Sequence, residues 1–198
     1  MLRAILAFTL LCAGAAALAQ GQAGANPRVA LDTSKGRIVV ELDVARSPIS
    51  ARNFLRYVDN RRYDGIDFYR AMPANAPGTG LIQAGVRDGP LFPPIAHEPT
   101  SQTGLSHVDG ALSVPRFAPG TPQGDFTIMV GAQTYLDAGP NSGSGDELGF
   151  AVFGRVVEGM DVVRAILASP TSPTEGEGVM RGQVLAPRIR ITAARRLP

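Results

Sequence analysis

The sequence predicts a mainly β protein: a closed eight-stranded antiparallel β-barrel capped by two α-helices. Two observations support this class. Short β-prone runs recur between Gly, Pro, Asn and Asp residues, and two longer segments carry apolar residues at the 3.6-residue spacing of helices. A barrel of eight strands is small enough for side chains to fill its interior.

The strands begin with a hairpin. Residues 28–33 alternate in the manner of a strand, Ser34-Lys35-Gly36 forms a turn, and residues 37–42 are a second β-rich run. Six further runs complete the set of eight, and we expect strands over 67–72, 81–84, 111–114, 126–130, 151–156 and 184–194.

Two helices are expected at the barrel ends. Ser47-Pro48 predicts a helix start, with Ser as the N-cap and Pro at the first helical position. One apolar stripe follows at positions i, i+3, i+4 and i+7, formed by Ala51, Phe54, Leu55 and Val58. A second helix is expected over residues 159–169, with Met160, Val163, Ile166 and Leu167 on one face.

The N-terminus has the layout of a secretory signal peptide: Met1-Leu2-Arg3, an apolar stretch, and Ala17-Leu18-Ala19 as a cleavage site. The alternative is a transmembrane anchor, but the apolar part is too short to span ~30 Å of hydrocarbon. We therefore predict a signal peptide over residues 1–19, a linker over 20–27 and one domain over 28–198. The predicted destination is the periplasm, with no membrane attachment after cleavage.

Charge and motifs exclude several function classes. The net charge is only +2 and the basic residues are scattered, so no nucleic-acid partner is expected. There is no G-x-S-x-G elbow and no G-K-[ST] phosphate loop, and His97-Glu98 is not continued as H-E-x-x-H. We predict no metal and no cofactor, interpret His97 and His107 as loop or structural histidines, and expect a monomer.

Several stretches, in order and at matching spacing, resemble exported bacterial members of the cyclophilin-type peptidyl-prolyl cis-trans isomerase family. They are residues 28–70, 81–85 (LIQAG), 98–116, 124–137 (GDFTIMVGAQTYLD) and 150–163. The resemblance implies a barrel that accelerates X–Pro bond rotation in exported proteins during folding. Its partners would be proline-containing polypeptides.

The resemblance also implies site residues. Arg70, in Phe68-Tyr69-Arg70, falls on the catalytic arginine, and Gln83 falls on a glutamine that would hold the substrate backbone or orient Arg70. The implied substrate-binding positions are Leu81, Pro115, Phe126, Thr127, Tyr135, Leu136 and Phe150.

The proline pocket departs from the family pattern, because Gly80 and Thr127 stand where the family usually has aromatic residues. An alternative function therefore remains open: a catalytically weak cyclophilin-like chaperone or peptide-binding module. A third reading, an exported barrel that binds a small ligand, would require an apolar lumen instead of a packed barrel core.

Overall fold

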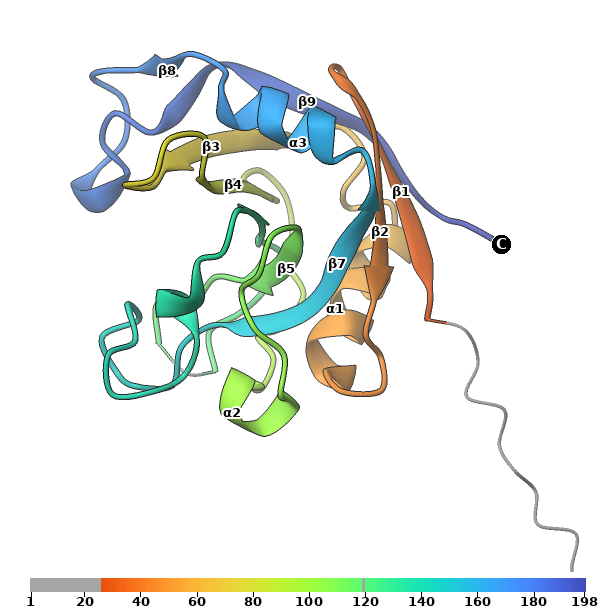
Figure 1. Ribbon diagram of the computed structural model, residues 1–198. Helices are drawn as coiled ribbons and strands as arrows, with labels where there is room; N and C mark the ends of the chain where they lie inside the picture. Colours follow the sequence, from red (N-terminus) through yellow and green to blue (C-terminus); the bar gives the residue numbers. More distant parts are fainter. Residues whose placement is uncertain (1–25, 119) are drawn as a thin grey trace, which may run out of the picture.

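Nine strands form one antiparallel sheet in the part of the chain that the computed structural model describes, residues 26–118 and 120–198. They are β1 (Arg28–Thr33), β2 (Gly36–Leu42), β3 (Asp67–Pro73), β4 (Gly80–Gly85), β5 (Ala111–Val114), β6 (Phe126–Val130), β7 (Ala151–Glu158), β8 (Thr171–Ser172) and β9 (Val184–Arg196). The sheet order is β1-β2-β7-β5-β6-β4-β3-β9-β8, and pairing of β1 with β9 closes the barrel (Figure 1).

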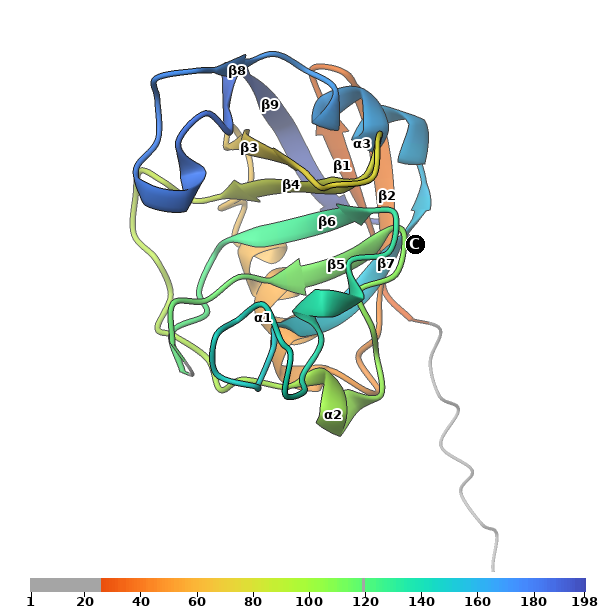
Figure 2. The ribbon, with the colours of Figure 1, turned by 60° about the vertical axis from the view of Figure 1, so that its left-hand side comes forward.

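The expected eight-stranded barrel is confirmed, and each predicted strand lies within a residue or two of an observed one. β8 was missed because a two-residue strand carries no periodic signal. Seen from one side, β3, β4, β6 and β5 lie next to one another across the barrel wall (Figure 2), and the candidate site is built on this wall.

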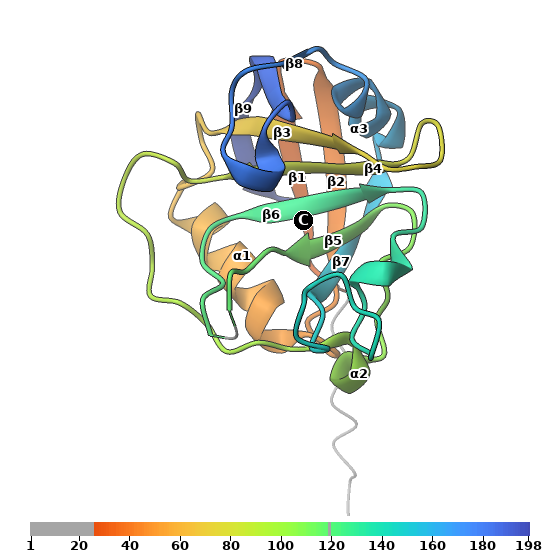
Figure 3. The same cartoon turned by 90° about the vertical axis from the view of Figure 1, so that its left-hand side faces the viewer.

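Both expected helices are present. α1 (Pro48–Asp59) packs against β7 and β9, and α3 (Met160–Leu167) packs against β2, β3, β4 and β6, so the two helices cover different parts of the barrel (Figure 3). Three short helices were not predicted, namely α2 (Thr100–Thr103), η1 (Thr134–Leu136) and η2 (Gly178–Met180).

The barrel interior is filled by aromatic side chains. The Phe54 ring of α1 lies 5.2 Å from that of Phe126 and 5.4 Å from that of Phe153, and both barrel residues are at most 1% exposed. Side chains therefore occupy the space that a lumen ligand would need. This packing contradicts the third reading of the sequence.

The start of α1 differs from expectation. Ser47 occupies the N-cap position and Pro48 the first turn, but the Ser47 side chain makes no cap hydrogen bond to the helix. Its hydroxyl donates instead to Glu98, and the same carboxylate accepts the backbone N–H groups of Ile49 at 2.9 Å and Ser50 at 2.7 Å. A carboxylate from a distant loop thus satisfies the first helical N–H groups.

The predicted signal peptide lies outside the described residues, as does most of the predicted linker. Across 26–118 and 120–198, no helix is both long enough and apolar enough to cross a membrane. The helices and strands of the barrel run from Arg28 to Arg196.

Candidate active site

A β-bulge places Arg70 on the outer wall of the barrel. Phe68 pairs with Ala84 and Arg70 pairs with Gln83, so β3 has one extra residue, Tyr69, between the two pairs. Phe68 and Ala71 both point into the core. The bulge lets two consecutive side chains, Tyr69 and Arg70, leave the core and face outward together.

The guanidinium of Arg70 is held on three sides. Its Nε donates to Oε1 of Gln183 at 2.8 Å, and its Nη1 donates to Oε1 of Gln83 at 3.0 Å. Its Nη2 lies 3.4 Å from the sulfur of Met72. Burial lowers the pKa of Arg70 from its usual value, while the phenols of Tyr69 and Tyr135 act in the opposite direction.

Behind Gln83 lies a half-buried carboxylate, Asp125, directly before β6. Its Oδ2 accepts the Tyr69 hydroxyl at 2.5 Å and the Gln83 amide at 3.1 Å. Burial raises the pKa of Asp125, although these two hydrogen bonds oppose the rise. Burial and the neighbouring Asp125 raise the pKa of Tyr69 strongly, so Tyr69 remains a donor.

An apolar cluster, here called the outer cluster, covers the same wall. It contains Leu81, Ala111, Met129, Leu136 and Val152, with Met72, Leu105 and Phe150 packed against it. It is separate from the barrel core and meets Arg70 through Met72. A cationic donor at the edge of an apolar surface can bind a ligand with an apolar ring next to a polar bond.

Three predicted binding residues, Leu81, Leu136 and Phe150, belong to the outer cluster. Pro115 is half-buried just after β5, and Tyr135 on η1 is 47% exposed.

Of the two predicted binding residues on β6, Thr127 pairs with Gln83 across the wall, whereas Phe126 belongs to the barrel core. Thr127 is buried, and its hydroxyl donates to the carbonyl of Ser113 at 3.2 Å. The prediction for Phe126 is wrong: its ring is 1% exposed and stacks edge-on with Phe54 and Phe68 inside the barrel.

Sequence reasoning missed Asp125, Gln183, Met72 and Met129. Ile128 and Met129 are neighbours on β6, and Ile128 faces the core while Met129 faces the outer cluster. Only the strand pairing reveals which of the two faces outward. Gln183 reaches Arg70 across 113 positions of sequence, a distance at which no local pattern can give a signal.

Both histidines lie outside the candidate site. His97 is in a loop, where its Nε2 is 3.2 Å from the carbonyl oxygen of Leu148. The ring of His107 is completely buried, with Nδ1 2.6 Å from Oδ1 of Asp137 and Nε2 2.8 Å from the hydroxyl of Ser113. Burial lowers the pKa of His107, whereas Asp137 acts to raise it. Because the ring has no exposed surface, the effect of burial is the larger and the net pKa is lowered. This Ser-His-Asp series cannot attack a substrate, because Ser113 is only 1% exposed.

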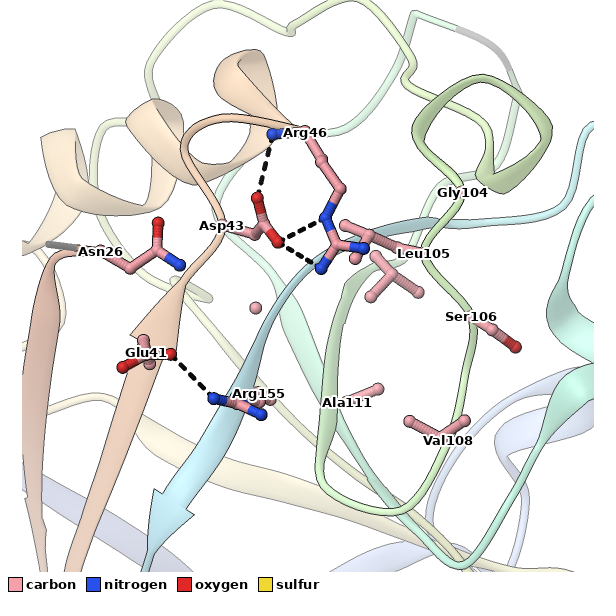
Figure 4. Close-up of a pocket in the computed structure, with 12 residues that line it drawn as sticks. Asn26, Glu41, Asp43, Arg46, Gly104, Leu105, Ser106, Val108, Ala111 and Arg155 are labelled. Carbon is pink, nitrogen blue, oxygen red and sulfur yellow. Dashed lines mark hydrogen bonds and ion pairs between the residues drawn. The ribbon is translucent and has the colours of Figure 1, made fainter. Parts of the chain in front are cut away.

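Two cavities lie near this wall. One, of about 350 Å³, lies beside η1 and is lined by residues from Thr134 to Ser142, including Tyr135. The other, of about 370 Å³, lies over β2, β5 and β7 and is rimmed by the ion pairs Asp43–Arg46 and Glu41–Arg155 (Figure 4). Arg70, Gln83 and Asp125 line neither cavity.

Comparisons with known proteins give matches over most of the chain. A family model described as cyclophilin type peptidyl-prolyl cis-trans isomerase/CLD matches residues 28–195. A peptidyl-prolyl cis-trans isomerase of Acinetobacter baylyi is 35% identical over 156 residues, which cover 78% of this chain and 79% of that protein. Peptidyl-prolyl cis-trans isomerase A of Dickeya dadantii is 32% identical over 142 residues, covering 71% of each.

Solved structures share the fold. A cyclophilin type peptidyl-prolyl cis-trans isomerase of Cryptosporidium parvum has a TM-score of 0.67 at 18% identity, covering 87% of this chain and 98% of that one. The same protein, crystallised in the presence of the dipeptide Ala-Pro, has a TM-score of 0.65 and covers 86% of this chain.

Proposed function

The chain belongs to the cyclophilin-type peptidyl-prolyl cis-trans isomerases and is an enzyme of that type, and we propose that Arg70 is its catalytic residue and that exported proteins are its substrates. The observation that carries the first proposal is the position of Arg70, which is fixed by two glutamines at the edge of the outer cluster. No nucleophile, metal or cofactor is needed for the reaction, since bond rotation breaks no σ bond.

The chemistry follows from amide resonance. Rotation about a peptide bond has a barrier of ~18–20 kcal/mol, because the twisted state loses the partial double bond. In that state the imide nitrogen of proline gains a lone pair that can accept a hydrogen bond. Arg70 would donate to this nitrogen more strongly than in the planar ground state, which lowers the barrier.

The polar contacts of Arg70 leave donors for the substrate. A guanidinium has five N–H groups, and Gln183, Gln83 and Met72 occupy three of them. One N–H remains on each terminal nitrogen, so the fork presents two donors to a bound peptide. Lysine could not provide this arrangement, because its ammonium lacks the planar fork.

The outer cluster would hold the proline ring while the rest of the peptide turns. Met72, Leu105 and Phe150, the half-buried members of the outer cluster, offer its apolar surface, and Met72 connects that surface to the guanidinium. The related protein from Cryptosporidium parvum, crystallised in the presence of Ala-Pro, supports proline-containing peptides as ligands.

A second candidate function is a peptide-binding module with little turnover. Gly80 and Thr127 favour it, because neither provides the aromatic wall that would hold proline firmly. Arg70 and Gln83 favour catalysis, and their observed hydrogen bond is the stronger argument.

The test is cis-to-trans exchange of a series of short X–Pro peptides, comparing the wild type with Arg70→Ala. Arg181→Ala, at an exposed arginine, is the matched control. We expect Arg70→Ala to lose about 10²–10³-fold in kcat/KM, as is typical when one transition-state donor is removed, while Arg181→Ala stays near the wild type. Equal rates for all three folded proteins would exclude Arg70 as the catalytic residue.

The proposal of export is supported by the signal-like layout of residues 1–19. Expression of the full chain in a bacterium, followed by fractionation and mass spectrometry of the intact protein, tests it. We expect a periplasmic monomer that begins at Gln20. A cytosolic protein that retains its first nineteen residues would contradict export.

A further inference from the structure

The orientation of the Gln83 amide is fixed by its two hydrogen-bond partners, Arg70 on one side and Asp125 on the other. Its oxygen accepts from Arg70 at 3.0 Å and its nitrogen donates to Asp125 at 3.1 Å. If the amide turned over, its NH₂ would face the guanidinium donors and its oxygen would face the carboxylate. Both contacts would then be repulsive, because an ionised carboxylate only accepts and a guanidinium only donates.

Asp125 is itself fixed from two sides. The Tyr69 hydroxyl donates to the same oxygen, Oδ2, at 2.5 Å. Within the described part of the chain, none of the ion pairs includes Asp125; Arg87, whose charge acts on Asp125, lies over the Tyr69 ring at 4.7 Å. Without an arginine partner, the carboxylate is oriented by these two neutral donors.

Gly85, at the end of β4, provides the space for this carboxylate. A Cβ on Gly85 would lie 1.7 Å from Oδ1 and 2.3 Å from Cγ of Asp125. Both distances are far below van der Waals contact, so any side chain at position 85 would displace the carboxylate. The backbone of Gly85 lies outside the left-handed region, so the lack of a side chain is what this site requires.

We propose that Asp125, seated against Gly85, is a positioning residue that orients Gln83 and through it fixes the guanidinium of Arg70 for catalysis. The inference rests on the proposed function of Arg70. Asp125 acts through hydrogen bonds in this scheme and does not touch the substrate.

Three variants separate hydrogen bonding, charge and space. Asp125→Ala removes the acceptor, and Gly85→Ala leaves every hydrogen-bonding group in place but displaces the carboxylate. Each should lower kcat/KM for X–Pro exchange by roughly tenfold or more, the effect of losing about one hydrogen bond to a charged group. Asp125→Asn should retain most activity, because one amide oxygen can accept from both Tyr69 and Gln83.

Two further readouts distinguish positioning from substrate contact. The Kd of a proline peptide, measured by titration, should change by less than about threefold in Asp125→Ala, since positioning acts on the transition state. The Nε–H signal of Arg70 in ¹⁵N-arginine NMR spectra should shift or broaden in Asp125→Ala and Gly85→Ala, and stay near wild type in Asp125→Asn. Thermal unfolding confirms that each variant is folded, and Asp125→Ala serves alone if Gly85→Ala is not.

Several outcomes would overturn the inference. An unchanged Arg70 signal and rate in Asp125→Ala would do so, and a loss in Asp125→Asn as deep as in Asp125→Ala would overturn the hydrogen-bond explanation. A loss of binding equal to the loss of kcat/KM would place Asp125 in direct contact with the substrate. If Arg70→Ala has wild-type activity, the proposed function fails, and the NMR signal still reports whether Asp125 holds Arg70.

Discussion

The carboxylate of Glu98 joins the loop before α2 to the start of α1, and the cost of removing it can be worked out from four hydrogen bonds. Glu98 is 3% exposed. It accepts from the backbone N–H groups of Ile49 and Ser50 at 2.9 and 2.7 Å, and from the hydroxyls of Ser47 and Ser50 at 2.9 and 2.7 Å.

Glu98→Ala leaves these four donors without their acceptor. The two hydroxyls can rotate to other acceptors, but the two backbone N–H groups cannot. Each buried donor left without a partner costs about 1–3 kcal/mol, so we expect a loss of about 3–4 kcal/mol in the free energy of unfolding. Glu98→Gln keeps one acceptor oxygen and should lose about half as much.

Urea unfolding at equilibrium measures this loss as a shift in midpoint at constant m-value. Glu177→Ala, at an exposed glutamate, is the control and should change stability by no more than about 0.5 kcal/mol. If Glu98→Ala unfolds within 1 kcal/mol of the control, on the order of a single weak cap, the four bonds do not hold α1 and the reasoning is refuted.

Four further predictions follow from the site and the core. Arg70→Lys should lower kcat/KM almost as much as Arg70→Ala, because the ammonium keeps the charge but loses the fork; near-wild-type exchange would contradict this. Gly80→Ala should lower the free energy of unfolding by at least about 2 kcal/mol, and Gly78→Ala by about 1 kcal/mol. Both glycines have positive φ, but only Gly80 lacks space for a Cβ. Equal urea midpoints for the two variants would contradict this. Phe126→Leu should cost roughly 1–2 kcal/mol of stability yet leave kcat/KM unchanged below the unfolding transition, because the ring lies in the core. Burial lowers the pKa of His107, so the unfolded chain binds the proton first; the free energy of unfolding should fall as pH drops below about 6.5, and less so in His107→Asn.

The barrel could be predicted from the sequence because its eight longer strands are β-prone runs separated by Gly, Pro, Asn and Asp residues. The strand that contains Arg70 was predicted from the residue pattern, but the candidate catalytic role of Arg70 could be inferred only through the resemblance. The outward direction of Arg70 depends on the bulge at Tyr69, and a bulge becomes visible only when two strands are aligned.

The error at Phe126 has a physical cause. All five residues of β6 are buried, from Phe126 to Val130, because one face meets the barrel core and the other meets the outer cluster. A strand buried on both faces has no alternation of polar and apolar residues, so the sequence cannot tell which face each residue takes. Glu98 was likewise missed as a cap, since its partners lie 48 to 51 positions away.

The missing aromatic at position 80 is a consequence of the turn that precedes it. The backbone N–H of Ala74 donates to the carbonyl of Thr79 and closes this turn, and Gly80 then has φ of +146°. A Cβ there would lie 2.1 Å from the carbonyl oxygen of Met72, so no side chain fits while the turn is kept. Aromatic contact cannot be restored by substitution at position 80 alone.

Apolar contact with proline must therefore come from other side chains of this wall. Met72 is the flexible, half-buried member of the outer cluster, and it also touches the guanidinium of Arg70, whereas Met129 is 1% exposed. A thioether adapts its shape to a ligand more readily than a fixed ring does. The wall thus exchanges a rigid aromatic contact for an adaptable one, while the two glutamines keep the guanidinium in a fixed position. If Arg70 is the catalytic residue, as proposed, we expect catalysis to depend more on the precision of that polar network than on a tight fit around the proline ring.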